Sequence, residues 1–482
     1  MGASDFGVFN VLGGAIAMLG FLNAAMASAT QRFMSYSEGS GDKENQRVIF
    51  NVSLILHVFI ACLAGLLFLL FGYFFFHGLL NIPSERYFAA KIVYGSLIVS
   101  TMFTVMTVPY DAVMNAHENF KYYAIIGIFE SLLKLSVAFV CVYSLYDKLI
   151  IYGLLMGGIP LVTLSIMRIY CHRRYTECVV QPRKYWDKNI LHSMTSFAGW
   201  NLLGNSSTMI GNYGNAIVVN HFFGAVINAS MGIVSQLQGQ LLVLTNNMLK
   251  VLIPVIIKKE GANQRDEMLK WSLEGCRFSY LLLVWIAIPF CVEAPFILKM
   301  WLKDVPEWTV LFLRLQVVRT LLELTTQSFS TSLDATGKIK EVNLITAILF
   351  FSPLILEWVM FGIGFRAYWM YILMIIVVII QNLVRITLCK KYCGLNISLY
   401  VKDFLLPMLL FTIELIVIAI LPSLFMSIGW GRAILSVSLS IVVFLVSGYV
   451  YILHEDEKNI VNKLLVKIYK PLSPYFKNSD NL

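Results

Sequence analysis

Charged side chains are scarce in this sequence. Asp, Glu, Lys and Arg make up 13% of its 482 residues and hydrophobic residues make up 58%, whereas a soluble domain carries roughly 25% charged residues. This shortage excludes an ordinary soluble protein. Apolar segments of about 20 residues, the length that crosses a bilayer core, recur along the whole chain, and the alternating pattern of a transmembrane β-barrel is absent. The sequence therefore predicts an all-α polytopic membrane protein.

Metal-binding and catalytic patterns are lacking as well. The eight cysteines are scattered, and none belongs to the paired Cys or His spacing that a zinc site needs. The longest loop expected outside the cytosol, Leu298–Glu307, is too short for a catalytic domain. We therefore expect no metal, no cofactor and no enzymatic activity, which disfavours a membrane-bound polysaccharide polymerase. Met1–Asn10 contains no basic residue, so no cleavable signal peptide is predicted.

The net charge of +9 does not indicate a nucleic-acid partner, because the basic residues lie in short loops between apolar segments. Lys and Arg concentrate in every second loop, as cytosolic loops do. This bias predicts a multi-pass protein whose C-terminus is cytosolic. The predicted spans number about thirteen and lie at 8–30, 48–77, 88–114, 122–145, 149–170, 192–221, 225–257, 271–297, 308–332, 341–363, 367–389, 402–425 and 431–453.

The spans suggest two related halves. An odd number of spans leaves Met1 outside the cytosol, which is an unusual start for such a protein. Gly2-Ala3 opens the first span as Gly224-Ala225 opens the seventh, so we expect two parallel repeats, the first lacking a helix before Met1. The predicted units are an incomplete N-terminal lobe at 1–170, a cytosolic inter-lobe linker at 171–191, a C-terminal lobe at 192–389, a terminal helix pair at 402–453 and a cytosolic basic tail at 454–482.

The stretch Phe197–Lys250 is long enough for two spans but unusually polar. On its first helix, steps of three and four place one polar set on a single face: Asn201, Asn205, Thr208, Asn212 and Asn215. After a break at 221–224, the next helix carries Asn228, Ser235, Gln236, Asn246 and Lys250. Such side chains either join helices by hydrogen bonds or line a hydrated path. The number in register favours the path, so these ten residues are the predicted substrate cavity.

Seven segments resemble bacterial polysaccharide-repeat flippases of the Wzx type, which belong to the multidrug/oligosaccharidyl-lipid/polysaccharide exporter superfamily. They are Gly2–Asn10, Ser28–Phe33, Phe197–Asn201, Phe223–Ala225, Pro254–Gly261, Met300–Leu302 and Ala335–Lys338. The resemblance covers essentially the whole chain. It implies two six-helix lobes with pseudo-two-fold symmetry around a central cavity, plus two C-terminal helices. In these flippases a helix normally precedes the segment that matches Gly2–Asn10, which agrees with the odd span count.

The resemblance also implies a cargo and a membrane location. The cargo is an undecaprenyl-pyrophosphate-linked oligosaccharide, flipped by alternating access from the cytosolic to the periplasmic leaflet of the bacterial inner membrane during polysaccharide (for instance O-antigen) biosynthesis. The expected partners are this lipid, membrane lipids, and the polysaccharide polymerase and chain-length machinery. A cation-coupled multidrug exporter of the same superfamily is the alternative. Such an exporter should expose carboxylates in its cavity, and Phe197–Lys250 contains none.

A pyrophosphate cargo requires cations within the membrane. The candidate phosphate ligands are Arg32, Lys134, Lys250 and Arg319. Lys134 follows Glu130 by four residues and Arg319 precedes Glu323 by four, so each could instead form a helical ion pair. Lys250 ends the polar helix pair and is expected to line the cavity. Arg32 is expected at the cytosolic mouth, where it either meets phosphate or simply follows the positive-inside rule.

Overall fold

The computed structural model describes residues 9, 12–13, 20–79, 84–459 and 462–463, and this part of the chain is helical without strands. Ten of its helical segments are long and apolar enough to cross a membrane, which confirms the all-α membrane class. The α-helices are α2 Gly20–Ser40, α3 Lys43–Phe74, α4 Tyr87–Ala116, α5 Phe120–Tyr143, α6 Lys148–Arg174, α7 Lys188–Gly261, α8 Arg265–Val292, α9 Ala294–Leu302, α10 Thr309–Leu324, α11 Gln327–Thr336, α12 Ile339–Gly362, α13 Trp369–Cys393, α14 Ile397–Tyr400, α15 Leu406–Ile420 and α16 Trp430–Ser447.

Acidic and amide side chains start several helices. Asn119 accepts a hydrogen bond from the backbone N–H of Tyr122 at the start of α5, and Asp147 accepts two at the start of α6. Asp187 does the same for α7. These caps satisfy N–H groups that have no partner within the helix. They fix where the chain turns back, so each helix enters the bundle at a defined position.

The long helix α7 bends at Gly224, where the backbone has φ 76° and ψ −175°. Glycine adopts this conformation without the strain that a side chain would cause. The predicted break at 221–224 is therefore confirmed. Two other predicted spans are wrong as continuous helices: 271–297 is interrupted at Glu293, between α8 and α9, and 308–332 is interrupted at Thr325 and Thr326, between α10 and α11.

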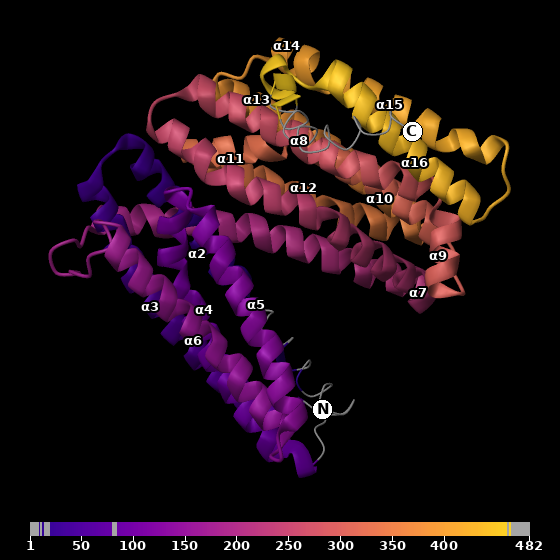
Figure 1. Ribbon diagram of the computed structural model, residues 1–482. Coiled ribbons are helices and arrows are strands. Elements are labelled where there is room, and N and C mark those ends of the chain that lie inside the picture. The colour runs from indigo at the N-terminus through magenta and orange to yellow at the C-terminus, as the bar shows by residue number, and fades with distance from the viewer. Residues whose placement is uncertain (1–8, 10–11, 14–19, 80–83, 460–461, 464–482) are drawn as a thin grey trace, which may run out of the picture.

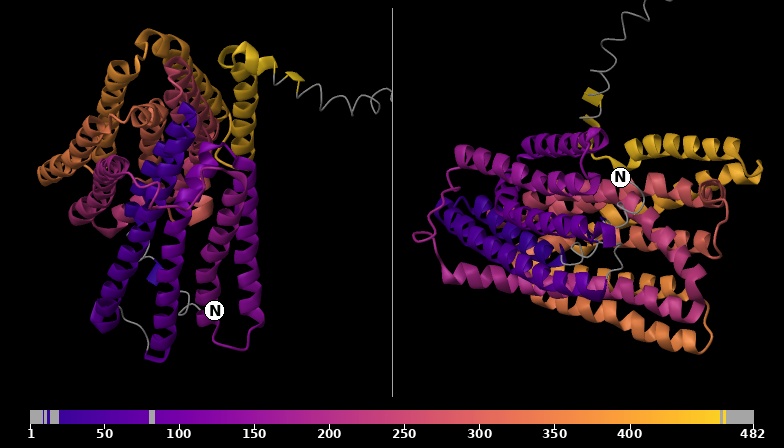
Figure 2. Two further views of the ribbon diagram at one scale, coloured as in Figure 1. Left: turned by 90° about the vertical axis from the view of Figure 1, so that its left-hand side faces the viewer. Right: turned by 90° about the horizontal axis from the view of Figure 1, so that it is seen from below.

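The helices form two lobes. Helices α2 to α6 make the N-terminal lobe, and α7 to α16 make the C-terminal lobe (Figure 1). Each has its own apolar core: Phe50, Val113 and Met114 are fully buried in the first, and Phe312, Phe329 and Phe404 in the second. The lobes converge at one end and diverge toward the other (Figure 1), and Figure 2 shows the same helices from the convergent end and from below. The predicted two-lobe architecture is confirmed.

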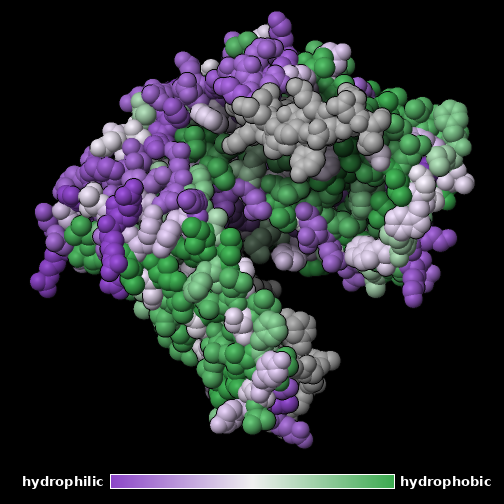
Figure 3. Space-filling view, viewed as in Figure 1, coloured by the Kyte–Doolittle hydropathy of each residue, from purple (hydrophilic) through white to green (hydrophobic). Residues whose placement is uncertain are grey.

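At the convergent end the two lobes touch through backbone. A Cβ atom on Gly39 of α2 would collide with the backbone of Lys258 of α7, and one on Gly261 would collide with the backbone of Tyr36. Glu118, after α4, also pairs with Lys258 at 2.9 Å. This end carries the 171–191 and 258–265 connections, which the charge bias predicts to be cytosolic. The hollow between the lobes opens toward the other end (Figure 3).

Parts of the N- and C-terminal predictions lie outside the described residues. Continuous helix is described from Gly20, so most of 8–19 in the predicted first span is not covered, while α2 extends beyond residue 30 to Ser40. The predicted basic tail is described only to residue 463. The connection between α6 and α7 runs from 175 to 187, inside the predicted linker.

Candidate functional site

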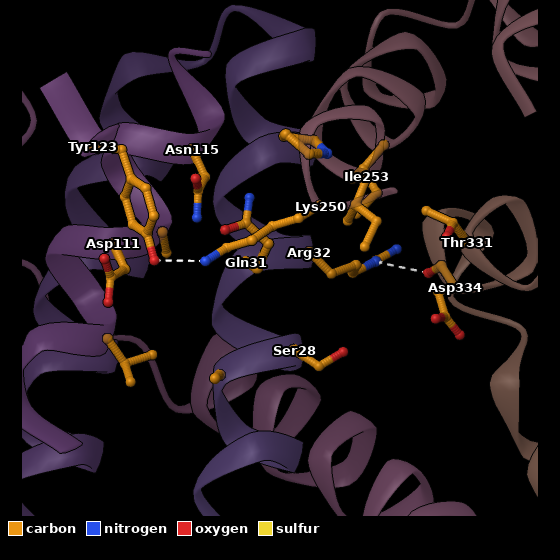
Figure 4. A pocket seen from close by; sticks show the side chains of 15 residues that line it. Ser28, Gln31, Arg32, Asp111, Asn115, Tyr123, Lys250, Ile253, Thr331 and Asp334 are labelled. Atoms are coloured by element: carbon orange, nitrogen blue, oxygen red, sulfur yellow. Dashed lines mark hydrogen bonds between the residues drawn. The ribbon is translucent and has the colours of Figure 1, made fainter. Parts of the chain in front are cut away.

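A cavity of about 320 Å³ lies between the lobes near their convergent end. We call it the inter-lobe pocket. Its polar lining comes from five helices (Figure 4), namely Ser28, Gln31 and Arg32 of α2, Asp111 and Asn115 of α4, Tyr123 of α5, Lys250 of α7, and Thr331 and Asp334 of α11. Both lobes therefore contribute to it, so the pocket must change shape whenever the lobes move relative to each other.

Arg32 reaches from the N-terminal lobe to the C-terminal lobe. Its Nε donates to the carbonyl oxygen of Asp334 at 3.2 Å, and its Nη2 donates to that of Ala335 at 2.9 Å. These carbonyls belong to the last turn of α11, where the helix dipole favours a cation. The guanidinium also lies 4.7 Å from the ring centre of Phe33 and 5.6 Å from that of Phe197. Aromatic faces hold the cation at the interface.

Lys250 reaches in the opposite direction. Its ammonium donates to the Tyr123 hydroxyl at 2.5 Å, so a cation on α7 contacts α5 across the interface. In Figure 4 the two cationic side chains extend to opposite sides of the pocket. Neither Arg32 nor Lys250 takes part in an ion pair with another described residue. Both cations are held by neutral oxygen atoms.

Two carboxylates share the inter-lobe pocket with these cations. Asp111, which accepts a hydrogen bond from Thr107 at 3.3 Å, and Asp334 both line it. Phe197–Lys250 itself contains no carboxylate, but the expectation of a cavity without carboxylates is wrong, because helices distant in sequence supply Asp111 and Asp334. A further carboxylate, Glu357 of α12, is fully buried in the C-terminal lobe beside Asn215, whose amide can donate to it at 3.2 Å.

The predicted polar stripe of α7 divides between two spaces in the C-terminal lobe. Asn201, Asn205 and Thr208 line a pocket of about 240 Å³, which we call the amide pocket. There Asn201 donates to Ser28 of the other lobe and accepts from Asn343, both at 3.2 Å. A larger space of about 700 Å³, the amide chamber, is lined by Thr208, Asn212, Asn215, Asn228 and Ser235. Gln236 and Asn246 are exposed and line none of these three described spaces.

The candidate cations are not gathered in one place. Lys134 is half-exposed on α5 and pairs with Glu130 at 2.6 Å, as the four-residue spacing allows. Arg319 of α10 lines the amide chamber and forms no ion pair with Glu323 among the described residues. Arg385 of α13 is a further cation and lines the amide pocket. Only Arg32 and Lys250 meet in the inter-lobe pocket.

One group of side chains outside the membrane could hold a metal ion by proximity. Potential ligand atoms of Glu38, His117 and Glu177 lie within 4.8 Å of one another. The His117 ring lies between the two carboxylates, with Nδ1 3.4 Å from Glu38 and Nε2 hydrogen-bonded to Glu177. Burial by itself raises the pKa of Glu177, but the bond from His117, a backbone hydrogen bond and the nearby charges of His117 and Lys43 together outweigh it and bring that pKa below the ordinary value. The imidazole thus joins the 175–187 linker to α2 and α4.

Comparisons with known proteins identify the fold. No family model and no curated protein sequence matches the chain. A MATE transporter in the bent conformation matches with a TM-score of 0.72 at 15% identity, over 82% of this chain and 90% of the transporter. An outward-facing multidrug resistance MATE family transporter of the MOP superfamily matches with a TM-score of 0.71 at 13% identity, over 82% and 89%.

A third similar structure is a MOP superfamily transporter from Pyrococcus furiosus, described as having a binding pocket of reverse polarity that suggests a different function. It matches with a TM-score of 0.68 at 14% identity, over 82% of this chain and 88% of that one. At such identities the likeness establishes the fold alone. The chain therefore has the two-lobed fold seen in these MATE and MOP superfamily structures.

Proposed function

We propose that this protein flips an undecaprenyl-pyrophosphate-linked oligosaccharide from the cytosolic to the periplasmic leaflet of the bacterial inner membrane. The Wzx-like segments support this cargo, and the MATE-like fold supports alternating access between the lobes. The excess of basic residues at the convergent end supports a cytosolic position for that end. In this orientation the described conformation opens to the periplasm.

The observation that carries the proposal is the meeting of Arg32 and Lys250 in the inter-lobe pocket. Each is bonded to neutral acceptors, either backbone carbonyls or a phenol. A pyrophosphate can take over these donors without breaking an ion pair, and charge-assisted hydrogen bonds to phosphate are stronger than the bonds they replace. Because the two cations come from different lobes, binding of the anion is sensitive to how the lobes are arranged.

The sugars and the lipid tail of the cargo also meet surroundings that match their chemistry. The amide pocket adjoins the interface through Ser28 and offers amide and hydroxyl groups to sugar hydroxyls. The lipid tail stays in the bilayer, whose hydrocarbon matches the exposed apolar surfaces of α15 and α16. The polysaccharide polymerase and chain-length machinery are the partners expected to consume the flipped product.

A cation-coupled multidrug exporter is the second candidate, because Asp111 and Asp334 line the same pocket. Carboxylates in a cavity suit a cationic drug or a coupling ion. Deletion of the gene separates the two functions. The flippase predicts loss of surface polysaccharide with accumulation of lipid-linked repeats, whereas unchanged polysaccharide with new drug sensitivity would support the exporter.

A further inference from the structure

The amide chamber contains a cation, Arg319, that forms no ion pair with any residue in the described part of the chain. The chamber lies between the two halves of α7 and helices α10, α12 and α13, and its volume is about 700 Å³. Arg319 of α10 lines it and is 9% exposed. Ligand sites in proteins commonly measure about 300–1,000 Å³, so the chamber has the size of a binding site.

The contacts of Arg319 are poor for a buried guanidinium. Among the described residues, its Nη1 donates to the sulfur of Met374 at 3.4 Å, while its buried Nε has no hydrogen-bond partner. A thioether is a weak acceptor, and a buried charge without a good partner is costly. The geometry therefore leaves room for an acceptor supplied from outside the chain.

The nearby carboxylate does not fill this role. Glu323 lies one helical turn after Arg319 and lines the chamber, but the described ion pairs do not join the two. Glu323 also lines the amide pocket, together with Arg385, whose buried Nε is likewise without a partner. Arg385 shares that pocket with Asp334 as well, and among the described residues neither carboxylate forms an ion pair with Arg319, so Arg319 retains its capacity for another anion.

The other lining groups indicate the kind of anion. Asn212, Asn228, Gln238 and Gln316 present amides, and Tyr371 presents a ring to the same space. Amides and aromatic rings suit the hydroxyls and apolar faces of a sugar. A guanidinium offers two parallel donors that fit a carboxylate. A compact phosphate needs fewer of these neutral groups, and Arg32 and Lys250 already offer it a separate place.

We propose that the amide chamber binds a carboxylate-bearing sugar residue of the cargo, with Arg319 paired to the carboxylate. This inference rests on the proposed function. It adds a specificity: the chain selects repeat units that contain a uronic acid over units of equal size that are neutral.

Binding to the purified protein in lipid nanodiscs tests the inference. The two probes are undecaprenyl pyrophosphate carrying a disaccharide that ends in glucuronate, and the same lipid ending in glucose. The unchanged protein should bind the glucuronate lipid at least about tenfold more tightly, the effect of one charge-assisted hydrogen bond. Arg319→Gln should remove this preference while keeping the affinity for the glucose lipid. Arg319→Lys, which keeps the charge without the planar pair of donors, should retain part of it.

Arg314→Gln is the matched control, because Arg314 is an exposed arginine on the same helix that donates to the Cys291 carbonyl. It should leave the preference unchanged. Equal affinities for both lipids in the unchanged protein, or a preference that survives Arg319→Gln, would overturn the inference and leave the flippase proposal intact. Absence of binding to either lipid would instead overturn the flippase proposal, and the inference with it.

Discussion

Lys250 donates a 2.5 Å hydrogen bond to the hydroxyl of Tyr123, which joins the C-terminal lobe to the N-terminal lobe. Arg32 makes the reverse connection by donating to the carbonyls of Asp334 and Ala335. Each lobe therefore sends one cation to neutral acceptors on the other. The two cations belong to the contact between the lobes and also line the proposed anion site, so anion binding and lobe movement are coupled through the same side chains.

The charge of Lys250 and its bond to Tyr123 can be tested separately. Lys250→Gln removes the cation, and we expect it to reduce export of lipid-linked repeats by about tenfold or more, since a hydrogen bond to a charged group contributes roughly 1.5–3 kcal/mol. Tyr123→Phe removes only the phenolic acceptor and should reduce export less. The measurement is surface polysaccharide in a deletion strain that expresses each variant, normalised to protein level. Full export by Lys250→Gln would contradict a role for the charge.

The backbone contacts of Gly39 and Gly261 should control closure of the convergent end. Alanine at either position places a Cβ against backbone that cannot yield, and overpacking costs about 1–3 kcal/mol. We expect Gly261→Ala to open this end and to raise, several-fold, the labelling of a Ser28→Cys reporter from the cytosolic side of inside-out vesicles. Gly239→Ala is the control, because a Cβ there meets no atom within 4 Å. Equal labelling in the two variants would show that the backbone contact at Gly261 does not limit opening of the convergent end.

Arg432 and Glu293 form a buried pair that holds α16 against the break between α8 and α9. The guanidinium donates to both carboxylate oxygens, with distances of 2.8 Å and 3.0 Å for the two shortest bonds, and Glu293 is fully buried. Arg432→Met alone should destabilise the protein by about 3–5 kcal/mol because it leaves an unpaired buried carboxylate. The double variant Arg432→Met/Glu293→Met should recover most of the loss. Thermal unfolding in detergent measures both; additive losses would contradict the pairing.

The contact between Glu177 and His117 should depend on pH. The pKa of Glu177 is lowered from its ordinary value of 4.5. A lowered pKa means that the stabilisation is present above about pH 4.5 and is lost as the pH falls through the folded-state pKa. Glu177→Gln should therefore lower the melting temperature near neutral pH, because it removes roughly 1.5–3 kcal/mol from the free energy of unfolding. The difference from the unchanged protein should shrink as the pH falls below about 4.5. A difference that is constant with pH would show that the carboxylate charge is not involved.

Structural features that depend only on residues close together in the sequence could be predicted from local sequence patterns. The break at 221–224 follows from the interruption of the polar pattern, and it occurs at Gly224, the residue best suited to positive φ. The four-residue spacing of Glu130 and Lys134 allows the ion pair that the structure contains, whereas the same spacing of Arg319 and Glu323 gives none among the described residues. Hydrophobicity and length identified most of the membrane-spanning segments.

Contacts between distant segments could not be predicted in the same way. Asp111, Tyr123 and Asp334 enter the inter-lobe pocket from α4, α5 and α11, and no periodicity of one helix reveals that they meet. Arg385 lies near the end of the predicted span 367–389, about two turns before α13 ends at Cys393, yet it lines the amide pocket because of the helices that pack beside it. The division of the α7 stripe into a pocket and a chamber depends on which helices pack beside it.

Reconstitution tests the central claim most directly. The purified protein is placed in liposomes that carry an undecaprenyl-pyrophosphate-linked oligosaccharide in the inner leaflet, and an impermeant glycosidase outside reports its arrival in the outer leaflet. If the protein is a flippase, the unchanged protein should allow the glycosidase to cleave more lipid-linked oligosaccharide than the outer leaflet held at the start. With Lys250→Gln, cleavage should stop at that initial outer-leaflet amount. No cleavage beyond the outer pool with the unchanged protein, in vesicles that nevertheless exchange a cationic drug for Na⁺ or H⁺, would contradict the account and favour the exporter.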